Sequence, residues 1–366
     1  MAHHPGASVA EPVAREVYPA GRGSAPAAGP EGVPAPKPLR LWSAGDAARL
    51  GTPEVTIIMV SYNTRALTLR AIETLLAAGG DVLAEVLVCD NASGDGSAEA
   101  IRQRFPQIET IASPENLGFA RANNVVGALA HGEMLLLLNP DTETYDNAVA
   151  NLLDFARAHP QGGIYGGRTV FPDGSLNPAS CCNRISVRSQ FCRALYLDKL
   201  FPRSGFFNAE AIGNWKRDTE REVDVIVGCF LMIPKALWDR LGGFDLKYFM
   251  YGEEADLCHR ARALGYRPMV TPKATIMHLV GASSNVRAEK ILLVGQARAT
   301  LIREHWASWK VPVGLFLLWL WSAVRFSLYR LRALIAGNPD LPGKLTWDRV
   351  WSERKRWLKG YQEIQD

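Results

Sequence analysis

A carboxylate and a histidine, far apart in the chain, are residue types that can hold a divalent cation. Asp141 ends the apolar run "EMLLLLNPD" (133–141), and His278 lies in "IMHLVGASS" (276–284). Mg²⁺ takes one or two carboxylates together with substrate phosphates and water, so a carboxylate at a strand end can bind the cation and, through it, a diphosphate. A neutral imidazole would complement that carboxylate. Two plainer interpretations remain open, in which Asp141 caps the next helix and His278 is a hydrogen-bonded core residue.

Acidic residues also open the helix predicted in "YGEEADLCHRARALGY" (251–266). Glu254 shares a helical face with apolar residues at i+3, i+4 and i+7, so it points inward. Glu253 and Asp256 share a neighbouring face. We expect an inward carboxylate at a helix N-terminus to stay ionised, because the helix dipole favours the anion, and an ionised carboxylate in a cleft can act as a general base. Alternatively, these acidic residues only stabilise the first helical turn.

Two polar segments have the composition of a nucleotide pocket. In "DNASGDGS" (90–97), Asp90 can accept hydrogen bonds from a base or a ribose, and the glycines let backbone amides approach a ligand. "ENLGFARANN" (115–124) has similar character. The chain has no GxGxxG, GxxxxGK[ST] or GxSxG motif, which argues against a Rossmann dinucleotide site, a P-loop NTPase and an α/β-hydrolase.

Strands and helices alternate in the first half of the chain. Apolar runs predict buried strands at 55–60, 84–90, 108–113 and 133–141, with helices between them. This alternation predicts a doubly wound, mostly parallel α/β sheet, and ligands of such sheets bind beyond the carboxyl ends of the strands. Polar residues gather at those ends: Ser61, Tyr62, Asn63, Asp90, Asn91, Asn116, Asn139 and Asp141.

The C-terminal part contains an uninterrupted apolar segment, 311–324, followed by arginines. Fourteen helical residues rise only about 21 Å, short of the roughly 30 Å hydrocarbon core of a membrane. We therefore expect a helix lying in the membrane interface, with tryptophans at headgroup level. A buried core or dimer helix and a tilted membrane span are the alternatives.

Composition sets the remaining limits. The 366 residues are 48% hydrophobic and 21% charged, which excludes a disordered, collagen-like or coiled-coil chain. A net charge of +4 is too small to argue for nucleic acid. The six cysteines form no CxxC pair and are expected to be idle thiols. We expect three parts: a disordered Ala-, Pro- and Gly-rich tail (1–50), a catalytic domain (51–290) and a helical region (291–366). Residues 1–40 lack the apolar core of a signal peptide, so we expect a cytoplasmic protein.

Taken in order, the motifs resemble the inverting family 2 glycosyltransferases, which have the GT-A fold. The resemblance runs from Val55 to about Ser284, and within the family it is nearest to the bacterial rhamnosyltransferase-like branch that builds cell-surface polysaccharides. The segments that carry it are "VTIIMVSYNT", "VLVCDNASGDGS", "ENLGFARANN", "LLLLNPDTE", "VIVGCFLMIPKALWDRLGGFD", "FMYGEEADLCHRARALGY" and "HLVGASS".

The resemblance implies a role for each matching residue. Nucleotide and sugar contacts fall on Ser61, Tyr62, Asn63, Asp90, Asn91, Asn116, Gly118, Phe119, Arg121 and Asn123. The metal-binding DxD-type motif reads Asn139-Pro140-Asp141, so Asp141 and His278 would bind Mg²⁺ or Mn²⁺ while Asn139 only donates or accepts hydrogen bonds. The second position of the family's "ED" motif supplies the base, which makes Glu254 the first choice ahead of Glu253 and Asp256.

The expected reaction is a single displacement on a nucleotide-sugar donor. The resemblance suggests dTDP-rhamnose, with a UDP-hexose or UDP-galactofuranose as other candidates, and a saccharide or lipid-linked acceptor. The segment 180–216, which has little regular pattern, is a candidate cover for the acceptor site. We expect peripheral contact with the inner face of the cell membrane and no nucleic acid partner. A nucleotidyltransferase and an inactive sugar-nucleotide or partner-binding module are the alternative functions.

Overall fold

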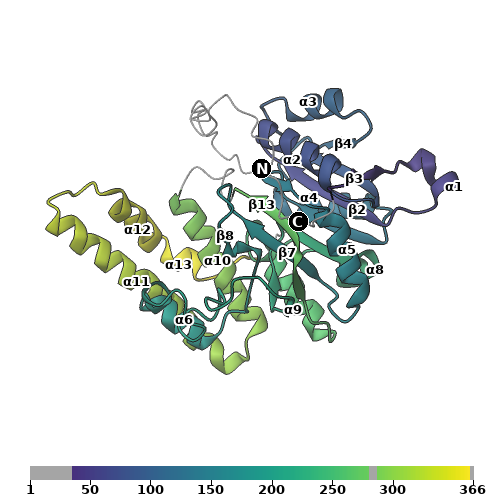
Figure 1. Cartoon of the computed structure of the whole chain (residues 1–366). Helices are drawn as coiled ribbons and strands as arrows, with labels where there is room; N and C mark the ends of the chain where they lie inside the picture. The colour runs from purple at the N-terminus through teal and green to yellow at the C-terminus, as the bar shows by residue number, and fades with distance from the viewer. Residues whose placement is uncertain (1–34, 280–286, 363–366) are drawn as a thin grey trace. The chain divides into compact units, whose positions relative to one another are not determined.

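The computed structural model describes residues 35–279 and 287–362 (Figure 1). The chain enters the sheet earlier than expected, because strand β1 (Arg40–Leu41) pairs with β3 and is followed by the short helices η1 (Ala44–Asp46) and α1 (Ala47–Leu50). Leu39 and Trp42 are buried and anchor this segment. The prediction that disorder extends to residue 50 is therefore wrong for residues 40–50, since two apolar side chains suffice to add an edge strand. Residues 1–34 of the predicted tail, and residues 280–284 of the last motif, lie outside the described residues.

The first half forms the parallel sheet that the alternation of strands and helices predicts. Strands β2 (Val55–Ser61), β3 (Leu83–Asp90), β4 (Glu109–Ala112) and β5 (Met134–Leu138) pair in parallel, with β2 between β3 and β5. Helices α2 (Arg65–Ala78), α3 (Ser97–Arg104) and α4 (Gly118–Leu129) connect them. Successive residues of β2 face opposite sides of the sheet: Ile57 packs with α2 and α5, and Ile58 packs with α4, α8 and α9.

The second half makes the sheet mixed. Strand β12 (Phe230–Pro234) lies antiparallel between β5 and β7 (Tyr165–Val170), and β7 runs parallel to β13 (Met269–His278). Strand β13 is ten residues long and ends at His278. The smaller pieces are β6 (Thr142–Thr144), α5 (Ala148–Ala158), β8 (Leu176–Asn177), η2 (Pro178–Ser180), β9 (Cys181–Cys182), β10 (Arg221–Glu222), β11 (Val225–Ile226), α8 (Lys235–Leu241) and α9 (Glu253–Ala263).

The pairing pattern brings the predicted ligand-binding residues to one edge. Strands β5 and β7 are both antiparallel to β12, so they point the same way, as do β2, β3 and β13. The carboxyl ends of β3, β5 and β13 therefore lie at the same edge, and they carry Asp90, Asp141 and His278.

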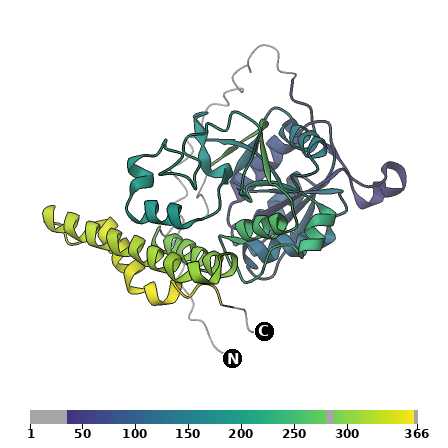
Figure 2. The same cartoon turned by 90° about the horizontal axis from the view of Figure 1, so that it is seen from below.

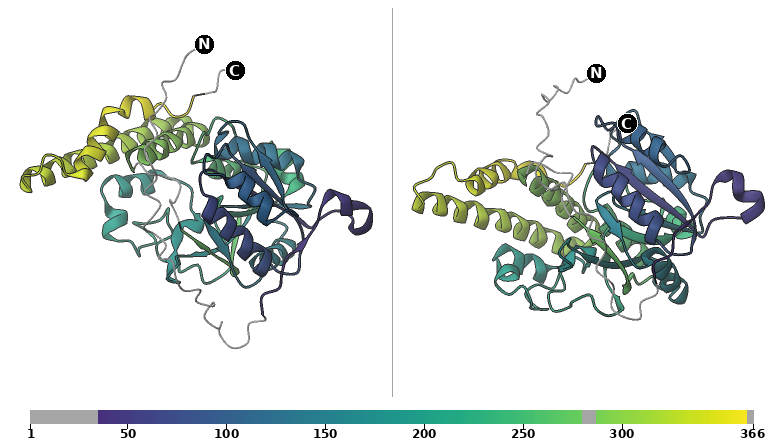
Figure 3. Two further views of the ribbon diagram at one scale, coloured as in Figure 1. Left: turned by 90° about the horizontal axis from the view of Figure 1, so that it is seen from above. Right: turned by 45° about the horizontal axis from the view of Figure 1, so that its top comes forward.

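Helices form the C-terminal region, which packs on the segment that holds α6 (Val187–Ala194) and α7 (Leu197–Leu200). Figure 2 shows α10 (Arg287–His305), α11 (Val311–Ile335), α12 (Pro342–Ser352) and α13 (Arg354–Trp357) lying together beside the sheet, and Figure 3 shows the same group from two further sides. The short turn η3 (Ser308–Lys310) leads into α11. Their shared core consists largely of Leu318, Trp321, Trp347, Val350 and Trp357.

The apolar segment is part of a longer helix than its sequence suggests. Helix α11 has 25 residues, about 37 Å at 1.5 Å per residue, so its length alone does not exclude a membrane span. It continues past residue 324 because Arg325 is buried and donates hydrogen bonds to the carbonyl oxygens of Arg193 and Ala194. One side of α11 is thus committed to contacts within the protein.

Candidate active site

The end of β3 holds a buried carboxylate with free hydrogen-bonding capacity. Asp90 accepts one hydrogen bond, from the Ser93 amide to Oδ2 at 3.2 Å, while Oδ1 is buried and has no partner among the described residues. The Asn91 side chain donates to Asn116 Oδ1 at 2.9 Å and accepts from the Leu117 amide at 2.8 Å. These bonds fix the turn before α4 next to Asp90, which leaves Asp90 Oδ1 available to a ligand donor.

A close contact joins this turn to the segment that precedes α9. Gly118 has a positive φ of 73°, and a Cβ added there would lie 3.0 Å from the Phe249 carbonyl oxygen, so only glycine fits. Phe119 packs on Phe244 with 5.7 Å between ring centroids. The "ENLGFARANN" motif therefore sits against the chain that leads to Glu254.

Several residues predicted to touch the nucleotide have internal roles. Ser61 is wholly buried, and its hydroxyl lies 2.8 Å from Thr68 Oγ1 and 3.1 Å from Thr64 Oγ1. Asn123 is also buried and donates to the Phe119 carbonyl oxygen. The structure thus gives the side chains of Ser61 and Asn123 a positioning role in place of the ligand contact expected from the sequence.

The remaining strand-end residues are better placed for a ligand. Tyr62 is 43% exposed, and Arg121 is exposed and lies 3.6 Å from Glu115. Asn63 has a left-handed backbone, and its Oδ1 accepts from the Gly94 amide at 2.8 Å. This bond ties the β2 and β3 ends together and leaves Tyr62 at the surface.

Asp141 and His278 form a close, partly desolvated pair. The distance between His278 Nε2 and Asp141 Oδ1 is 3.3 Å, and the side chains are only 9% and 11% exposed. Burial lowers the pKa of His278, but its hydrogen bonds to Asp141 and Cys229 outweigh burial and raise it to about 10. His278 Nδ1 is buried without a partner among the described residues. With bonds of about 2.0–2.2 Å at a right angle, two ligands of one cation lie about 3 Å apart, so the pair fits a divalent cation.

The structure excludes the interpretation that Asp141 caps the next helix. Strand β6 follows it directly, and the next helix, α5, has Asn147 at its N-cap, so Asp141 does not cap that helix. Its neighbour Asn139 donates its amide to the Cys229 carbonyl oxygen at 3.1 Å, which ties this turn to the segment before β12.

Glu254 lines a pocket to which Val225 and Val227 also contribute. The pocket has about 620 Å³ of empty space, part of it open to solvent, and it is walled by β9, β11, the start of α9 and by α10. Burial raises the pKa of Glu254. Burial and the Glu254 charge together raise the pKa of Glu253 well above its ordinary value, and the two carboxyl groups share a hydrogen bond. Desolvation thus opposes the stabilising effect expected from the helix dipole, and it raises the pKa of both carboxyl groups.

The segment 225–229 lies next to both the Glu254 pocket and the Asp141–His278 pair. Val225 and Val227 line the Glu254 pocket, and the Ile226 amide lies 3.4 Å from Cys258 Sγ on α9. Cys229, two residues after Val227, contacts Asn139 and His278. The segment 225–229 thus runs from the wall of the Glu254 pocket to the Asp141–His278 pair, and these two residues are not among those that line the pocket.

Comparisons with known proteins identify the family and support the fold. The family model described as "Glycosyl transferase family 2" matches residues 56–209. The chain carries a family 2 glycosyltransferase domain of the GT-A fold. The resemblance and the fold class predicted from the sequence are confirmed.

Two relatives of the glycosyltransferase come from bacterial glycan synthesis. An N-acetylglucosaminyl-diphospho-decaprenol L-rhamnosyltransferase of Mycobacterium tuberculosis is 29% identical over 244 residues, which are 62% of this chain and 78% of the relative. An O-antigen biosynthesis protein of Myxococcus xanthus is 26% identical over 242 residues, which are 65% of this chain but only 18% of that protein.

Among solved structures, a mannosyltransferase of Pyrobaculum calidifontis, in complex with GDP-Man and Mn²⁺, superimposes with a TM-score of 0.51. The superposition covers 83% of this chain and 88% of that one at 18% identity, so it supports the fold alone.

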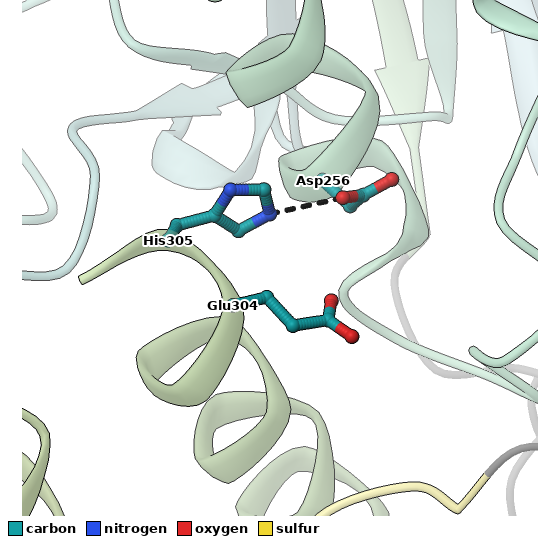
Figure 4. A group of neighbouring side chains, drawn as sticks. All are labelled: Asp256, Glu304 and His305. Carbon is teal, nitrogen blue, oxygen red and sulfur yellow. Dashed lines mark hydrogen bonds and ion pairs between the residues drawn. The ribbon is translucent and has the colours of Figure 1, made fainter. Parts of the chain in front are cut away.

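In the glycosyltransferase, both carboxylate oxygens of Asp256 are already paired within the protein. Its Oδ2 accepts from Arg260 at 2.6 Å and its Oδ1 contacts His305 Nε2 at 2.9 Å, as Figure 4 shows for the histidine. Burial alone would raise the pKa of Asp256, but the bonds from His305 and Arg260 lower it.

Asp256, Glu304 and His305 have the residue types and spacing of a metal site, but their charges are already matched. Glu304 pairs with Lys247 and accepts from the Tyr248 hydroxyl at 3.0 Å, and Asp256 is paired as above. This ion-pair network joins α9 to α10 and holds the helix that carries Glu254.

Sequence reasoning missed the residues that α10 and the segment 180–216 contribute to the Glu254 pocket. Arg298 and Glu210 line it together with Val294, Ala297 and Leu301. The one indication in the sequence was that the segment 180–216 has an irregular pattern, and we expected this segment to cover the acceptor site. Nothing in the pattern of α10 indicated that this helix turns back onto α9.

Proposed function

We propose that this glycosyltransferase moves rhamnose from a nucleoside diphosphate donor to a lipid-linked saccharide, with inversion at the anomeric carbon. The observation that carries the proposal is that the segment 225–229 contacts the Asp141–His278 pair through Cys229 and lines the Glu254 pocket through Val225 and Val227. The name of the mycobacterial relative, a rhamnosyltransferase that acts on a diphospho-decaprenol, supports the donor sugar and the acceptor class.

The donor would lie along the carboxyl edge of the sheet. Asp90 Oδ1 has the free acceptor capacity that a base or ribose donor needs. Asp141 and His278 would hold a divalent cation, Mg²⁺ or Mn²⁺, and that ion would neutralise charge on the departing diphosphate. The Mn²⁺ bound in the archaeal mannosyltransferase is consistent with this. The further donor contacts proposed from the family resemblance are Tyr62, Asn63, Asn91, Asn116, Gly118, Phe119, Arg121 and Asn139.

Glu254 would act as the general base in a single displacement. Its carboxylate takes the proton of the acceptor hydroxyl while that oxygen forms a bond to the anomeric carbon. The bond from the anomeric carbon to the phosphate oxygen breaks, and its electron pair leaves with the nucleoside diphosphate. Attack from the face opposite the leaving group inverts the configuration. A raised pKa suits this role, since it brings the basicity of Glu254 nearer to the operating pH.

The outer face of α11 suits an acceptor that resides in a membrane. Opposite its buried face, α11 exposes Val313, Phe316, Trp319, Leu328, Leu331, Leu334 and Ile335. The helix has no acidic residue, and Lys310, Arg330 and Arg332 flank or interrupt this face. Apolar residues next to cations bind anionic lipid surfaces, so we place α11 in the interface, on the cytoplasmic side where nucleotide sugars are found.

A transfer assay tests the proposal. The purified full chain is incubated with Mg²⁺ or Mn²⁺, labelled dTDP-rhamnose or a UDP-sugar, and a short-chain prenyl-diphosphate saccharide. We expect rhamnose in the product, with its anomeric configuration by NMR opposite to that in the donor. Transfer from a UDP-sugar alone would move the proposal to another donor, and retained configuration would contradict the single displacement. Nucleotide binding without transfer to any acceptor would favour an inactive binding module.

A further inference from the structure

A cluster of arginines lies behind the Glu254 pocket, and the mechanism above makes no use of it. Arg298 of α10 lines the pocket and pairs through both terminal nitrogens with Glu210, with a further bond of 2.9 Å to Gln190 Oε1. Arg193 lies near the same groups, since the charges of Arg298, Glu210, Arg325 and Asp198 act on it. The cluster thus runs from the pocket wall towards α11.

The cluster has more positive than negative charge. Its cations are Arg193, Arg298 and Arg325, and its anions are Glu210 and Asp198. Arg298 forms an ion pair with Glu210, and Arg325 donates hydrogen bonds to backbone carbonyl oxygens. In the part of the chain that the structure describes, Arg193 forms no ion pair with a carboxylate and packs on the Trp321 ring at 5.5 Å. A half-buried guanidinium without a counter-ion is costly, and here burial, with Arg298 nearby, lowers the pKa of Arg193 to about 10.

Hydrogen-bond donors in the cluster are also unused. Arg193 Nε, Arg298 Nε and Gln190 Nε2 are all buried and have no acceptor among the described residues. Gln190 is only 2% exposed, so solvent does not satisfy its amide. Native proteins rarely leave such donors unpaired, and three of them around one excess positive charge indicate a missing anion with several oxygens.

The order of features across the protein indicates what bears that anion. Glu254 and Arg298 line the same pocket, the charge of Arg298 acts on Arg193, and Arg193 contacts Trp321 on α11. The outer face of α11 is apolar. A molecule with a sugar, then an anionic link, then a hydrocarbon chain would meet these features in the same order.

On this basis, and resting on the proposed function, we propose that Arg193, Arg298 and Gln190 bind the diphosphate of the lipid-linked acceptor. The site is separate from the donor diphosphate site at Asp141 and His278. It would make the enzyme select acceptors that carry a diphosphate between sugar and lipid, since a charge-assisted bond lost in a buried site weakens binding by roughly 10- to 100-fold.

The test compares two acceptors that differ only in the link. One carries the saccharide on a prenyl diphosphate, and the other carries the same saccharide as a phosphate-free alkyl glycoside. We expect Arg193→Gln to raise KM for the diphosphate acceptor by about 10-fold or more, with KM for the glycoside and for the donor changed by less than about 2-fold. Arg193→Lys should recover part of the loss. The matched control is Arg188→Gln on the exposed side of α6, which should change neither value.

Each other outcome overturns the proposal. An equal effect of Arg193→Gln on both acceptors would assign the cluster a structural role, and an effect on donor KM would assign the diphosphate to the nucleotide. If Arg193→Gln does not fold, the two acceptors are compared on the wild-type enzyme. We expect kcat/KM to be about 10-fold or more higher for the diphosphate acceptor than for the glycoside. Equal kcat/KM values for the two acceptors would contradict the site.

A binding measurement separates failure of this site from failure of the proposed function. Geranyl diphosphate is titrated into the full chain by calorimetry, with nucleoside diphosphate and Mg²⁺ at saturation to fill the donor site. We expect binding to the wild type and about 10-fold weaker binding to Arg193→Gln, whatever the transfer assay gives. Equal binding to both proteins, or none to either, would contradict the site.

Discussion

Glu254→Gln tests the assignment of the general base. Glutamine keeps the size of the side chain and removes the basic oxygen, and its neutral amide can still take part in the hydrogen bond that Glu253 and Glu254 share. A positioned general base contributes about 10²- to 10⁴-fold to the rate, or roughly 3–5 kcal/mol of transition-state stabilisation. We expect kcat to fall by that factor while donor KM stays within about 2-fold, since the residues proposed to contact the donor do not line the Glu254 pocket.

Glu253→Gln is the matched control. Burial and the neighbouring charge raise the pKa of Glu253 well above its ordinary value, which favours its neutral form. An amide resembles a protonated carboxyl in shape and neutrality, and we expect kcat to fall by less than about 10-fold. Because burial disfavours the charged form of Glu254, Glu254→Gln should also melt at or above the wild-type temperature at neutral pH.

Single-turnover and steady-state transfer assays of the two variants test whether Glu254 or Glu253 is the general base. A small effect of Glu254→Gln together with a large effect of Glu253→Gln would reverse the assignment. Large and equal effects of both would show that the pair acts as a unit and that neither residue alone is the base.

Three further outcomes follow from the structure. The wild-type kcat should be lost as pH falls through the raised pKa of Glu254, above the 4.5 of an ordinary glutamate, and a pH profile whose acid limb lies at or below that value would contradict the burial of this group. Asp256→Asn should lower the free energy of unfolding in urea by about 2 kcal/mol, less than for fully buried pairs because its partners are partly exposed; an unchanged midpoint would show that the network joining α9 to α10 contributes nothing. The double variant Phe316→Ser, Leu331→Ser should lose flotation with phosphatidylglycerol vesicles while keeping activity on the soluble alkyl glycoside; flotation equal to wild type would remove α11 from the membrane interface.

The parallel half of the fold follows from local pattern. Each of its strands is a short apolar run that ends in a polar cluster, and each helix has an apolar face, so their order and direction were predictable from the sequence. Asp141 and His278 come together because both lie at carboxyl ends of strands that point the same way, which is a consequence of topology that the motif order already implied.

The other half of the site depends on contacts that no local pattern encodes. Glu254 was identified from helical spacing, but the rise in its pKa arises from walls supplied by β9, β11 and α10, which are distant in sequence. Ser61 and Asn123 have the residue types of ligand contacts, yet nearby hydroxyl and carbonyl groups take up their hydrogen bonds. The length of α11 was underestimated because Arg325 interrupts the apolar run, although the protein buries this side chain and satisfies it with backbone carbonyl groups.

The central claim is that a cation-held diphosphate at Asp141 and His278 shares one site with Glu254, across residues 225–229. Anomalous diffraction from crystals grown with Mn²⁺ and a non-hydrolysable nucleotide sugar tests it most directly. The account predicts a manganese peak within bonding distance of Asp141 and His278, with the anomeric carbon of the sugar directed at Glu254. A manganese peak at Asp256, Glu304 and His305 instead, or a sugar directed away from Glu254, would contradict it.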